Sequence, residues 1–316
     1  MAAKTIIMSN FPKASIGLVI LGGLILGFQD SLVKASSSYT SFWQLQTIRS
    51  FFNLLLIIVF TLTFTSIRSI IPKRPLYVIL RSILIAACML CFFSGSVTLD
   101  FALMTAGLYT YPIFITIMAI PFLGERLNSN RILGIIFGIV GSIFILEPWT
   151  ADISYVQILP ICAGFLYACN IITIKKFCEK ENPISLAGIQ ALFFILIGIA
   201  GILFSDQIFS KSVKEDLPFI AVGWPDLTLF ILCICALASI CNLSGNIFII
   251  KGYQTADGSL LAPFDYVYLI FAILWGKIVL GTWPNFFDAI GVFLILLAGI
   301  ISSLESLTFK SHNGSF

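Results

Sequence analysis

The chain has 316 residues, of which 59% are hydrophobic and 10% charged, with a formal net charge of +3. Soluble domains carry roughly 25% charged residues, so this composition excludes an ordinary soluble enzyme or binding domain. A function that concerns the membrane is therefore expected.

Ten stretches are apolar for long enough to cross a bilayer, which takes roughly 20 residues as a helix. They are 16–35, 42–64, 76–98, 101–123, 132–148, 155–174, 184–204, 227–250, 259–281 and 285–304. The apolar runs are continuous rather than alternating, which favours helices over a barrel of strands. The sequence predicts an all-α membrane protein with ten transmembrane helices.

Basic residues indicate the orientation of these spans. If the N-terminus is cytoplasmic, ten crossings place on that side Arg68, Lys73, Arg74, Arg126, Arg131, Lys175, Lys176, Lys180, Lys251 and Lys310. The opposite side receives Lys34, Lys211, Lys214 and Lys277. Because Lys and Arg are in excess on the cytoplasmic side, we expect a multi-pass protein of the bacterial inner membrane with both termini cytoplasmic. An uncleaved first helix is favoured over a signal peptide.

No cofactor, metal or catalytic group is expected. Cys88–Cys91 and Cys233–Cys235 have spacings seen in metal sites, but His312 is the only histidine, so the cysteines are interpreted as small apolar side chains. The chain contains no nucleotide-binding Gly-x-x-x-x-Gly-Lys-Ser/Thr loop, which excludes direct use of ATP through that motif. No nucleic-acid partner is expected either.

The chain repeats a short pattern in two halves of five spans each, 14–148 and 153–306. The segment from Gly107 to Pro112 matches the segment from Gly258 to Pro263, since each has Gly, four residues and then Pro. Downstream, Leu123-Gly124 matches Leu280-Gly281, and Gly134 matches Gly291. An odd number of spans in each half gives the halves opposite orientations, which is typical of transporters with a substrate site between inverted repeats.

These residues also carry a family resemblance. In the first half they are Pro112, the run from Phe122 to Leu127 (Phe-Leu-Gly-Glu-Arg-Leu) and Gly134; in the second they are the run from Ala262 to Tyr266 (Ala-Pro-Phe-Asp-Tyr), Trp275-Gly276, Leu280-Gly281 and Gly291. Both halves resemble EamA-type domains of the drug/metabolite transporter superfamily, and the Ala-Pro-Phe-Asp-Tyr run resembles its S-adenosylmethionine uptake carriers. The resemblance implies ten helices, an inner-membrane location and a central cavity formed by both halves. The Gly-Glu of the first half is Gly-Thr in the second, which puts a role for paired acids in doubt.

Charges inside the spans are the first candidates for substrate binding, because a charge near the bilayer centre costs roughly 2.5–3.5 kcal/mol. Asp30 and Arg49 form a buried ion pair, line a cavity or lie at the lipid interface. Gln46 shares a helix face with Arg49 and is a further candidate. Arg81 either extends to the cytoplasmic interface or faces the cavity.

The ninth predicted span, 259–281, supplies further candidates. Pro263 is expected to bend or open its helix beside Asp265, whose carboxylate suits a cationic group, with Tyr266 and Tyr268 adding aromatic faces. Asp265 alternatively pairs with Lys251 or Arg81.

Four more candidates lie in spans four and eight. Tyr109 and Tyr111, next to Pro112, either face the cavity or pack around a kink. Asn242 and Asn246 share a face at i, i+4 and bind either a solute or a neighbouring helix.

The sequence therefore predicts a secondary active transporter that moves a small polar, amine-bearing or zwitterionic metabolite by alternating access. Asp30 and Asp265 would hold an amine and Arg49 a carboxylate, as in an amino acid or an S-adenosylmethionine-like compound. The alternatives are a neutral vitamin or an organic cation as substrate, a channel, or an intramembrane enzyme. Expected partners are the small-molecule substrate, the lipid bilayer and a coupling proton or counter-substrate, with the protein a monomer or homodimer.

Overall fold

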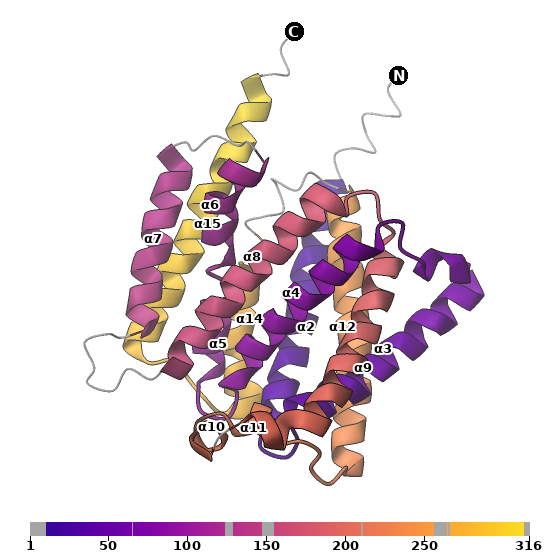
Figure 1. Ribbon diagram of the computed structural model, residues 1–316. Helices are drawn as coiled ribbons and strands as arrows, with labels where there is room; N and C mark the ends of the chain where they lie inside the picture. The colour runs from indigo at the N-terminus through magenta and orange to yellow at the C-terminus, as the bar shows by residue number, and fades with distance from the viewer. Residues whose placement is uncertain are drawn as a thin grey trace.

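The computed structural model describes residues 11–64, 66–123, 129–146, 155–209, 211–255, 264 and 266–312. The described part of the chain is a bundle of helices without strands (Figure 1). The longer helices are α2 (Phe11–Ser36), α3 (Phe42–Phe64), α4 (Pro75–Ser94), α5 (Phe101–Leu108), α6 (Tyr111–Leu123), α7 (Ser129–Leu146), α8 (Leu159–Phe177), α9 (Pro183–Ile208), α12 (Leu229–Thr255), α14 (Val267–Trp275) and α15 (Phe286–His312). The short ones are 3-10 turns at Ile67–Ile70 and Tyr155–Ile158, α10 (Lys211–Asp216), α11 (Pro218–Ala221) and a π-helix, η3 (Gly276–Leu280).

Several of the helices are long and apolar enough to span a membrane. Within the described residues, six helices meet both requirements, and four shorter apolar helices are Phe101–Ile115, Ile132–Phe144, Val267–Leu280 and Phe286–Ile301. Large hydrophobic side chains remain exposed on the outside of the bundle, among them Phe64 at 76% and Leu196 at 65%. Apolar surface of this extent belongs against lipid, so the all-α membrane fold expected from the sequence is confirmed.

The fourth predicted span is broken in the middle. α5 ends at Leu108 and α6 begins at Tyr111, immediately before Pro112, which lacks a backbone N–H and cannot continue the helix ladder. At the break, the Thr110 hydroxyl donates a hydrogen bond to the Gly107 carbonyl at 2.7 Å. A Cβ on Gly164 of α8 would lie 2.6 Å from the Thr110 hydroxyl, so this glycine lets α8 approach the break closely.

Helices from the two halves of the sequence pack against each other in pairs. α2 runs along α12, α4 along α8, α3 along α9 and α7 along α15. The α7–α15 pair stands at the left of Figure 1, and α3 and α9 lie together at the right. Residues distant in the sequence are thus brought together throughout the bundle.

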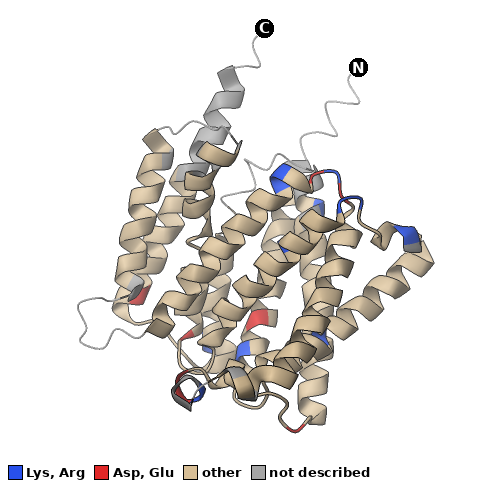
Figure 2. Cartoon of the chain, in the orientation of Figure 1, with Lys and Arg blue, Asp and Glu red and all other residues tan. Residues whose placement is uncertain are grey.

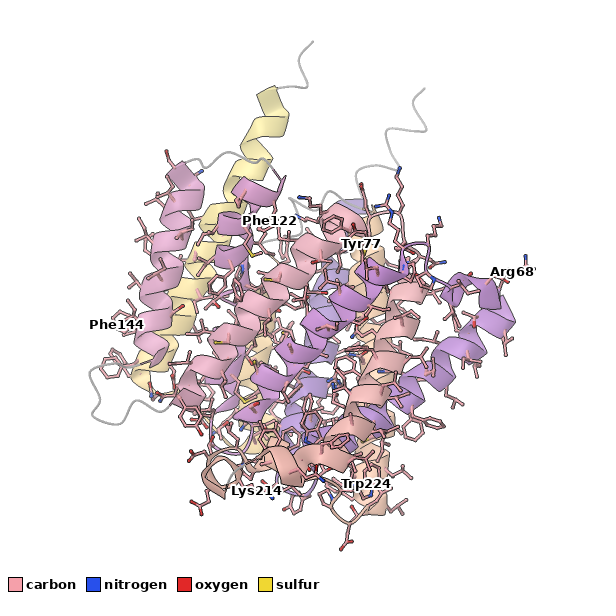
Figure 3. The ribbon with its side chains drawn as sticks, viewed as in Figure 1. Arg68, Tyr77, Phe122, Phe144, Lys214 and Trp224 are labelled. Atoms are coloured by element: carbon pink, nitrogen blue, oxygen red, sulfur yellow. The ribbon has the colours of Figure 1, made fainter. Side chains whose placement is uncertain are left out.

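The two ends of the bundle differ. At one, here called the terminal end, α2 begins at Phe11 and α15 ends at His312; α10 and α11 lie at the opposite end (Figure 1). Charged residues gather mainly toward these ends, and only a few lie in the middle of the bundle (Figure 2). Arg68 lies at the terminal end and Lys214 at the opposite end (Figure 3), so these residues mark the two sides of the protein.

Candidate functional site

A cavity of about 460 Å³ lies inside the bundle, within the range of about 300–1,000 Å³ that is usual for small-molecule sites. Its lining comes from α2, α3, α4, α8, α9, α12, α14 and the break between α5 and α6. The polar and aromatic-polar side chains that line it are Gln29, Asp30, Arg49, Ser50, Asn53, Arg81, Tyr109, Tyr111, Tyr167, Asn170, Gln190, Asn242, Asn246 and Tyr268.

The cavity extends from the middle of the bundle to the terminal end. It reaches Pro183, the first residue of α9, and Ile174, in the last turn of α8. On α9 its lining ends at Phe194, near the middle of that helix. The cavity therefore occupies one half of the bundle along its long axis.

The opposite end is closed by side chains that bond to backbone carbonyls. The Trp43 indole Nε1 donates to the Ile220 carbonyl in α11 at 2.6 Å, and the Ser41 hydroxyl donates to the Gly223 carbonyl at 2.5 Å. The Lys34 ammonium donates to the carbonyls of Ser96 and Leu99 at 2.6 and 2.5 Å. Two of these contacts join the start of α3 to the α11 segment, and the other two join α2 to the connection between α4 and α5.

Asp30 is the centre of a hydrogen-bond network between helices. Its carboxylate accepts hydrogen bonds from the Tyr268 hydroxyl of α14 and, at 2.8 Å, from the amide of neighbouring Gln29. Gln29 in turn accepts a hydrogen bond from the Asn242 amide of α12 at 3.0 Å. The network therefore ties α2 to α12 and α14, and Asp30 also lines the cavity.

Arg49 lies on the cavity without a direct partner in the described part of the chain. Its side chain is 6% exposed, and its Nε atom is buried without a hydrogen bond. Asp30 interacts with it through charge, but no direct ion pair joins the two among the described residues. Of the three alternatives for these residues, the geometry favours the cavity position. A buried guanidinium with free N–H groups suits an anionic ligand group.

Arg81 also lines the cavity instead of extending to the bundle end. Its Nη1 donates to the Leu186 carbonyl in α9 at 3.2 Å. Arg81 and Arg49 therefore both line the cavity.

Tyrosine rings form a continuous row across the cavity. Tyr109 stacks on Tyr268, with ring centroids 5.1 Å apart and an interplanar angle of 14°. Tyr109 also contacts Tyr111 at 5.5 Å, and Tyr111 contacts Tyr167 of α8 at 4.9 Å. Because the helix is broken after Leu108, the Tyr109 and Tyr111 rings both reach this row. Such rings bind planar or cationic groups.

The two asparagines of α12 have different roles. Asn242 bonds to Gln29 of α2, so part of its function is to join helices. Asn246 donates to the Asn242 backbone carbonyl at 2.7 Å and also lines the cavity. Both are therefore placed where they can reach a solute.

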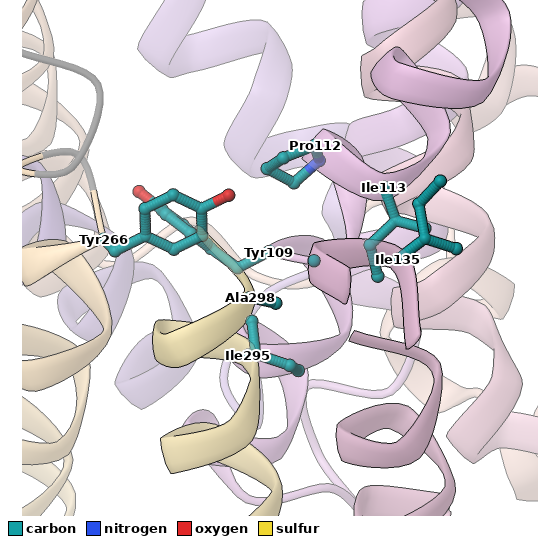
Figure 4. Close-up of a pocket in the computed structure, with 8 residues that line it drawn as sticks. Tyr109, Pro112, Ile113, Ile135, Tyr266, Ile295 and Ala298 are labelled. Atoms are coloured by element: carbon teal, nitrogen blue, oxygen red, sulfur yellow. The ribbon is translucent and has the colours of Figure 1, made fainter. Parts of the chain in front are cut away.

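The structure departs from the expectation at two candidates. Gln46 is 1% exposed and lies outside the cavity lining, because it is one helical turn nearer the closed end than Arg49. Tyr266 instead lines a separate pocket of about 10 Å³, room for about one water, beside Tyr109 and Pro112 (Figure 4). Its ring packs on Gly299, where a Cβ would lie 2.0 Å from the ring. Asp265, another candidate, lies outside the described residues.

Lining residues that were not singled out from the sequence include Tyr167 and Asn170 of α8 and Gln190 of α9. Asn170 is 2% exposed, and its Oδ1 atom has no hydrogen-bond partner among the described residues. Asn170 and Gln190 are uncharged amides within apolar spans, and that pattern could have identified them. The expectations from the sequence were based mainly on charges and prolines.

Comparisons with known proteins agree with this architecture. The EamA-like transporter family model matches residues 13–147 and again 155–304. An uncharacterized transporter of Helicobacter pylori (strain J99) is 23% identical over 306 residues, covering 95% of this chain and 98% of its own. A solved crystal structure superposes with a TM-score of 0.59 at 16% identity, covering 92% of this chain and 98% of its own.

Two further relatives have named substrates. An S-adenosylmethionine uptake transporter of Rickettsia bellii is 23% identical, covering 90% of this chain and 91% of its own. A riboflavin transporter of Vibrio cholerae is 25% identical, covering 61% of this chain and 59% of its own. The family model accounts for nearly the whole chain in two copies, and the chain belongs to the EamA-like transporter family.

Proposed function

We propose that this protein is a secondary active transporter that moves a small, amine-bearing or zwitterionic metabolite across the bacterial inner membrane. The observation that carries this proposal is the cavity on which the Asp30 carboxylate and the Arg49 guanidinium both lie, the latter with an Nε atom that has no partner in the described part of the chain. A carboxylate and a guanidinium on one cavity complement the amine and the carboxylate of a zwitterion. The tyrosine row beside them adds a surface for a flat or cationic group.

We further propose that the halves 14–148 and 153–306 are inverted repeats. Under such a repeat, each of the first five predicted spans corresponds to the span five places later. The contact between spans one and eight, α2 with α12, then corresponds to the contact between spans six and three, α8 with α4. The repeat exchanges α3 with α9 and α7 with α15, so the contact within each of these pairs is also consistent with it. This agreement supports the repeat without depending on residue identities.

The inverted repeat supports transport by alternating access. With both termini in the cytoplasm, the cavity described here is the inward-facing one, because it extends to the terminal end. The bonds of Trp43, Ser41 and Lys34 close the outer end. In the outward-facing state these bonds break, and new contacts around α8 and α9 close the cavity at the terminal end.

A neutral vitamin is the second candidate substrate. The relatives named as riboflavin transporters match about three fifths of this chain, and the parallel Tyr109 and Tyr268 rings suit a flat ring system. The relatives named for S-adenosylmethionine uptake match more of the chain, 90% for the one from Rickettsia bellii, and the charges on the cavity favour a charged substrate.

Thermal unfolding of the purified protein against a metabolite panel tests the proposal. The panel holds S-adenosylmethionine, free amino acids, organic cations and riboflavin. A ligand at 100 times its Kd stabilises the folded state by about 2.7 kcal/mol, which is readily measured. We expect a charged, amine-bearing compound to stabilise the wild type but not Asp30→Asn, and to enter liposomes that contain the wild type. Stabilisation by riboflavin alone, unaffected by Asp30→Asn, contradicts the proposal and supports the alternative.

A further inference from the structure

Amide side chains form one wall of the cavity, and the direction of each hydrogen bond among them follows from the acid at its centre. An ionised carboxylate accepts hydrogen bonds and donates none. Gln29 therefore turns its Nε2 group to Asp30, at 2.8 Å, and its Oε1 atom to the Asn242 amide, at 3.0 Å. Because Gln29 is only 2% exposed, it depends on these protein partners, and the carboxylate sets the direction of both bonds.

The same direction determines what the asparagines of α12 offer to a solute. Asn242 donates to Gln29 through Nδ2, and its Oδ1 atom has no hydrogen bond in the described part of the chain. Asn246 donates its Nδ2 group to the Asn242 backbone carbonyl at 2.7 Å, and its Oδ1 atom is likewise unbonded among the described residues. Both side chains line the cavity and share a helix face. The wall formed by α2 and α12 thus combines the Asp30 carboxylate with two amide carbonyl oxygens.

Unpartnered amide atoms elsewhere on the lining are acceptors too. Asn53 of α3 and Asn170 of α8 line the cavity, and each has a buried Oδ1 atom without a partner among the described residues. A buried acceptor is satisfied only by an N–H or O–H group. The buried donors without partners in the same part of the lining belong to the guanidinium groups of Arg49 and Arg81. The amides of the cavity therefore favour a solute rich in N–H groups.

We propose that Asp30, Asn242 and Asn246 form a subsite for a primary ammonium group. This inference rests on the proposed transport function and narrows its substrate class from cations in general to primary amines. A primary ammonium has three N–H donors, which match one carboxylate and two carbonyl oxygens. A quaternary ammonium or sulfonium ion carries the same charge without any N–H, so it leaves these oxygens unbonded. Arg49 remains the group for the carboxylate of the substrate.

The tyrosine row makes the opposite demand on a cation. Tyr268 bonds to Asp30 and stacks on Tyr109, so aromatic faces lie next to the proposed subsite. Aromatic faces bind fully methylated ammonium groups well. Methylation of an amine should therefore strengthen binding if the rings dominate, and weaken it if hydrogen bonds to the oxygens dominate. The sign of this effect distinguishes the two.

The test uses 2-phenylethylammonium and its N-methyl, N,N-dimethyl and N,N,N-trimethyl derivatives. All carry one positive charge at neutral pH, and each methyl group replaces one N–H. Isothermal titration calorimetry on the purified full-length protein gives the Kd of each compound. The variants are Asn242→Ala and Asn246→Ala, with Ser244→Ala as the matched control. Ser244 is on the same helix, donates to the Ile240 carbonyl and lies outside the cavity lining.

Asn246→Ala keeps the test decisive if Asn242→Ala fails to fold. The Asn246 side chain is exposed and its amide bonds only within α12, so its loss should leave the contact between α2 and α12 intact.

We expect the wild type to bind the primary ammonium at least about tenfold more tightly than the trimethyl compound, because hydrogen bonds to a charged group are lost on methylation. Each asparagine variant should lower this ratio about threefold or more, since one acceptor is missing. The loss should come from weaker binding of the primary ammonium, with the Kd of the trimethyl compound nearly unchanged. Ser244→Ala should keep the wild-type ratio.

Three results would overturn the subsite. They are a trimethyl compound that binds as tightly as the primary ammonium or more tightly, a ratio unchanged in the folded asparagine variants, and no binding by any compound of the series.

Binding of these compounds does not require transport, so the two proposals fail separately. If the ratio is as expected but no charged metabolite stabilises the protein or enters liposomes, the transport proposal fails. If a charged metabolite is transported but the trimethyl compound binds most tightly, the ammonium subsite fails and the transport proposal stands.

Discussion

The hydroxyl of Tyr268 in α14 donates a hydrogen bond to the carboxylate of Asp30 in α2. The two residues are 238 positions apart in the chain and come from different halves of it. Tyr268 also stacks on Tyr109, so one side chain links the acidic group of the cavity to the tyrosine row. Movement of α14 relative to α2 would therefore change both the orientation of the carboxylate and the aromatic surface.

The first prediction concerns this hydroxyl. Tyr268→Phe keeps the stacking on Tyr109 but removes the hydrogen bond to Asp30. Hydrogen bonds to charged groups contribute about 1.5–3 kcal/mol, so we expect transport efficiency to fall roughly 10- to 100-fold. Uptake into liposomes measures it. Tyr39→Phe, which removes a hydroxyl from a ring that is 66% exposed, is the matched control and should transport normally. Wild-type transport by Tyr268→Phe would contradict a functional role for the bond.

The second prediction concerns Asp30 and Arg49. Breaking a direct buried ion pair costs about 3–5 kcal/mol, which the double mutant would largely restore. Because no direct pair joins them in the described part of the chain, we expect the stability losses of Asp30→Asn and Arg49→Gln to be nearly additive, within about 1 kcal/mol. Both single variants and the double variant should fail to transport if, as proposed, each side chain contacts the solute.

Thermal unfolding and liposome uptake are measured on the same preparations. Arg68→Gln, at an exposed position of the terminal end, controls for the loss of a positive charge. A double variant that transports at the wild-type rate would show that the two residues form only a structural pair.

The third prediction concerns orientation. In intact cells, a membrane-impermeant thiol reagent should label Lys214→Cys, at the opposite end of the bundle, and leave Arg68→Cys unlabelled until the cells are permeabilised (Figure 3). The physical reason is the excess of Lys and Arg at the terminal end, which should be cytoplasmic. The wild type gives the background from native cysteines. The reverse labelling pattern would place both termini outside.

The fourth prediction concerns the packing of α3 on α9. A Cβ on Gly201 would lie 2.1 Å from the Trp43 ring, which is held by its bond to Ile220. Gly201→Ala should therefore destabilise the protein by about 1–3 kcal/mol through overpacking. Gly17→Ala is the matched control, since nothing lies within 4 Å of its Cβ and the gain in helix propensity is the same. Thermal unfolding of both variants in detergent measures the difference. Equal stability would show that the Trp43 ring can move aside.

Much of the fold follows from the sequence because the lipid bilayer restricts which backbone structures can form. In a bilayer the backbone must bond to itself, so a continuous apolar run of sufficient length becomes a helix whatever its neighbours are. Each of the ten predicted spans accordingly overlaps a helix or a pair of helices in the described residues. Pro112 likewise indicates a kink in the fourth span, because a residue without an N–H removes one hydrogen bond from the helix ladder. Asp30, Arg49 and Arg81 stand out in the sequence because charges in a bilayer are costly.

Which polar side chains meet was decided only by the tertiary structure. Gln46 shares a helix face with Arg49 by spacing, yet it lies toward the closed end and outside the cavity lining. Asn170, which was not singled out from the sequence, lines the cavity. Tyr266 and Tyr268 are two positions apart, but one packs on Gly299 and the other bonds to Asp30. Helical periodicity determines which residues share a face, and the neighbour of that face depends on how the helices cross. Those crossings depend on close contacts between distant residues, such as Gly201 with Trp43 and Gly164 with Thr110, that no local pattern records.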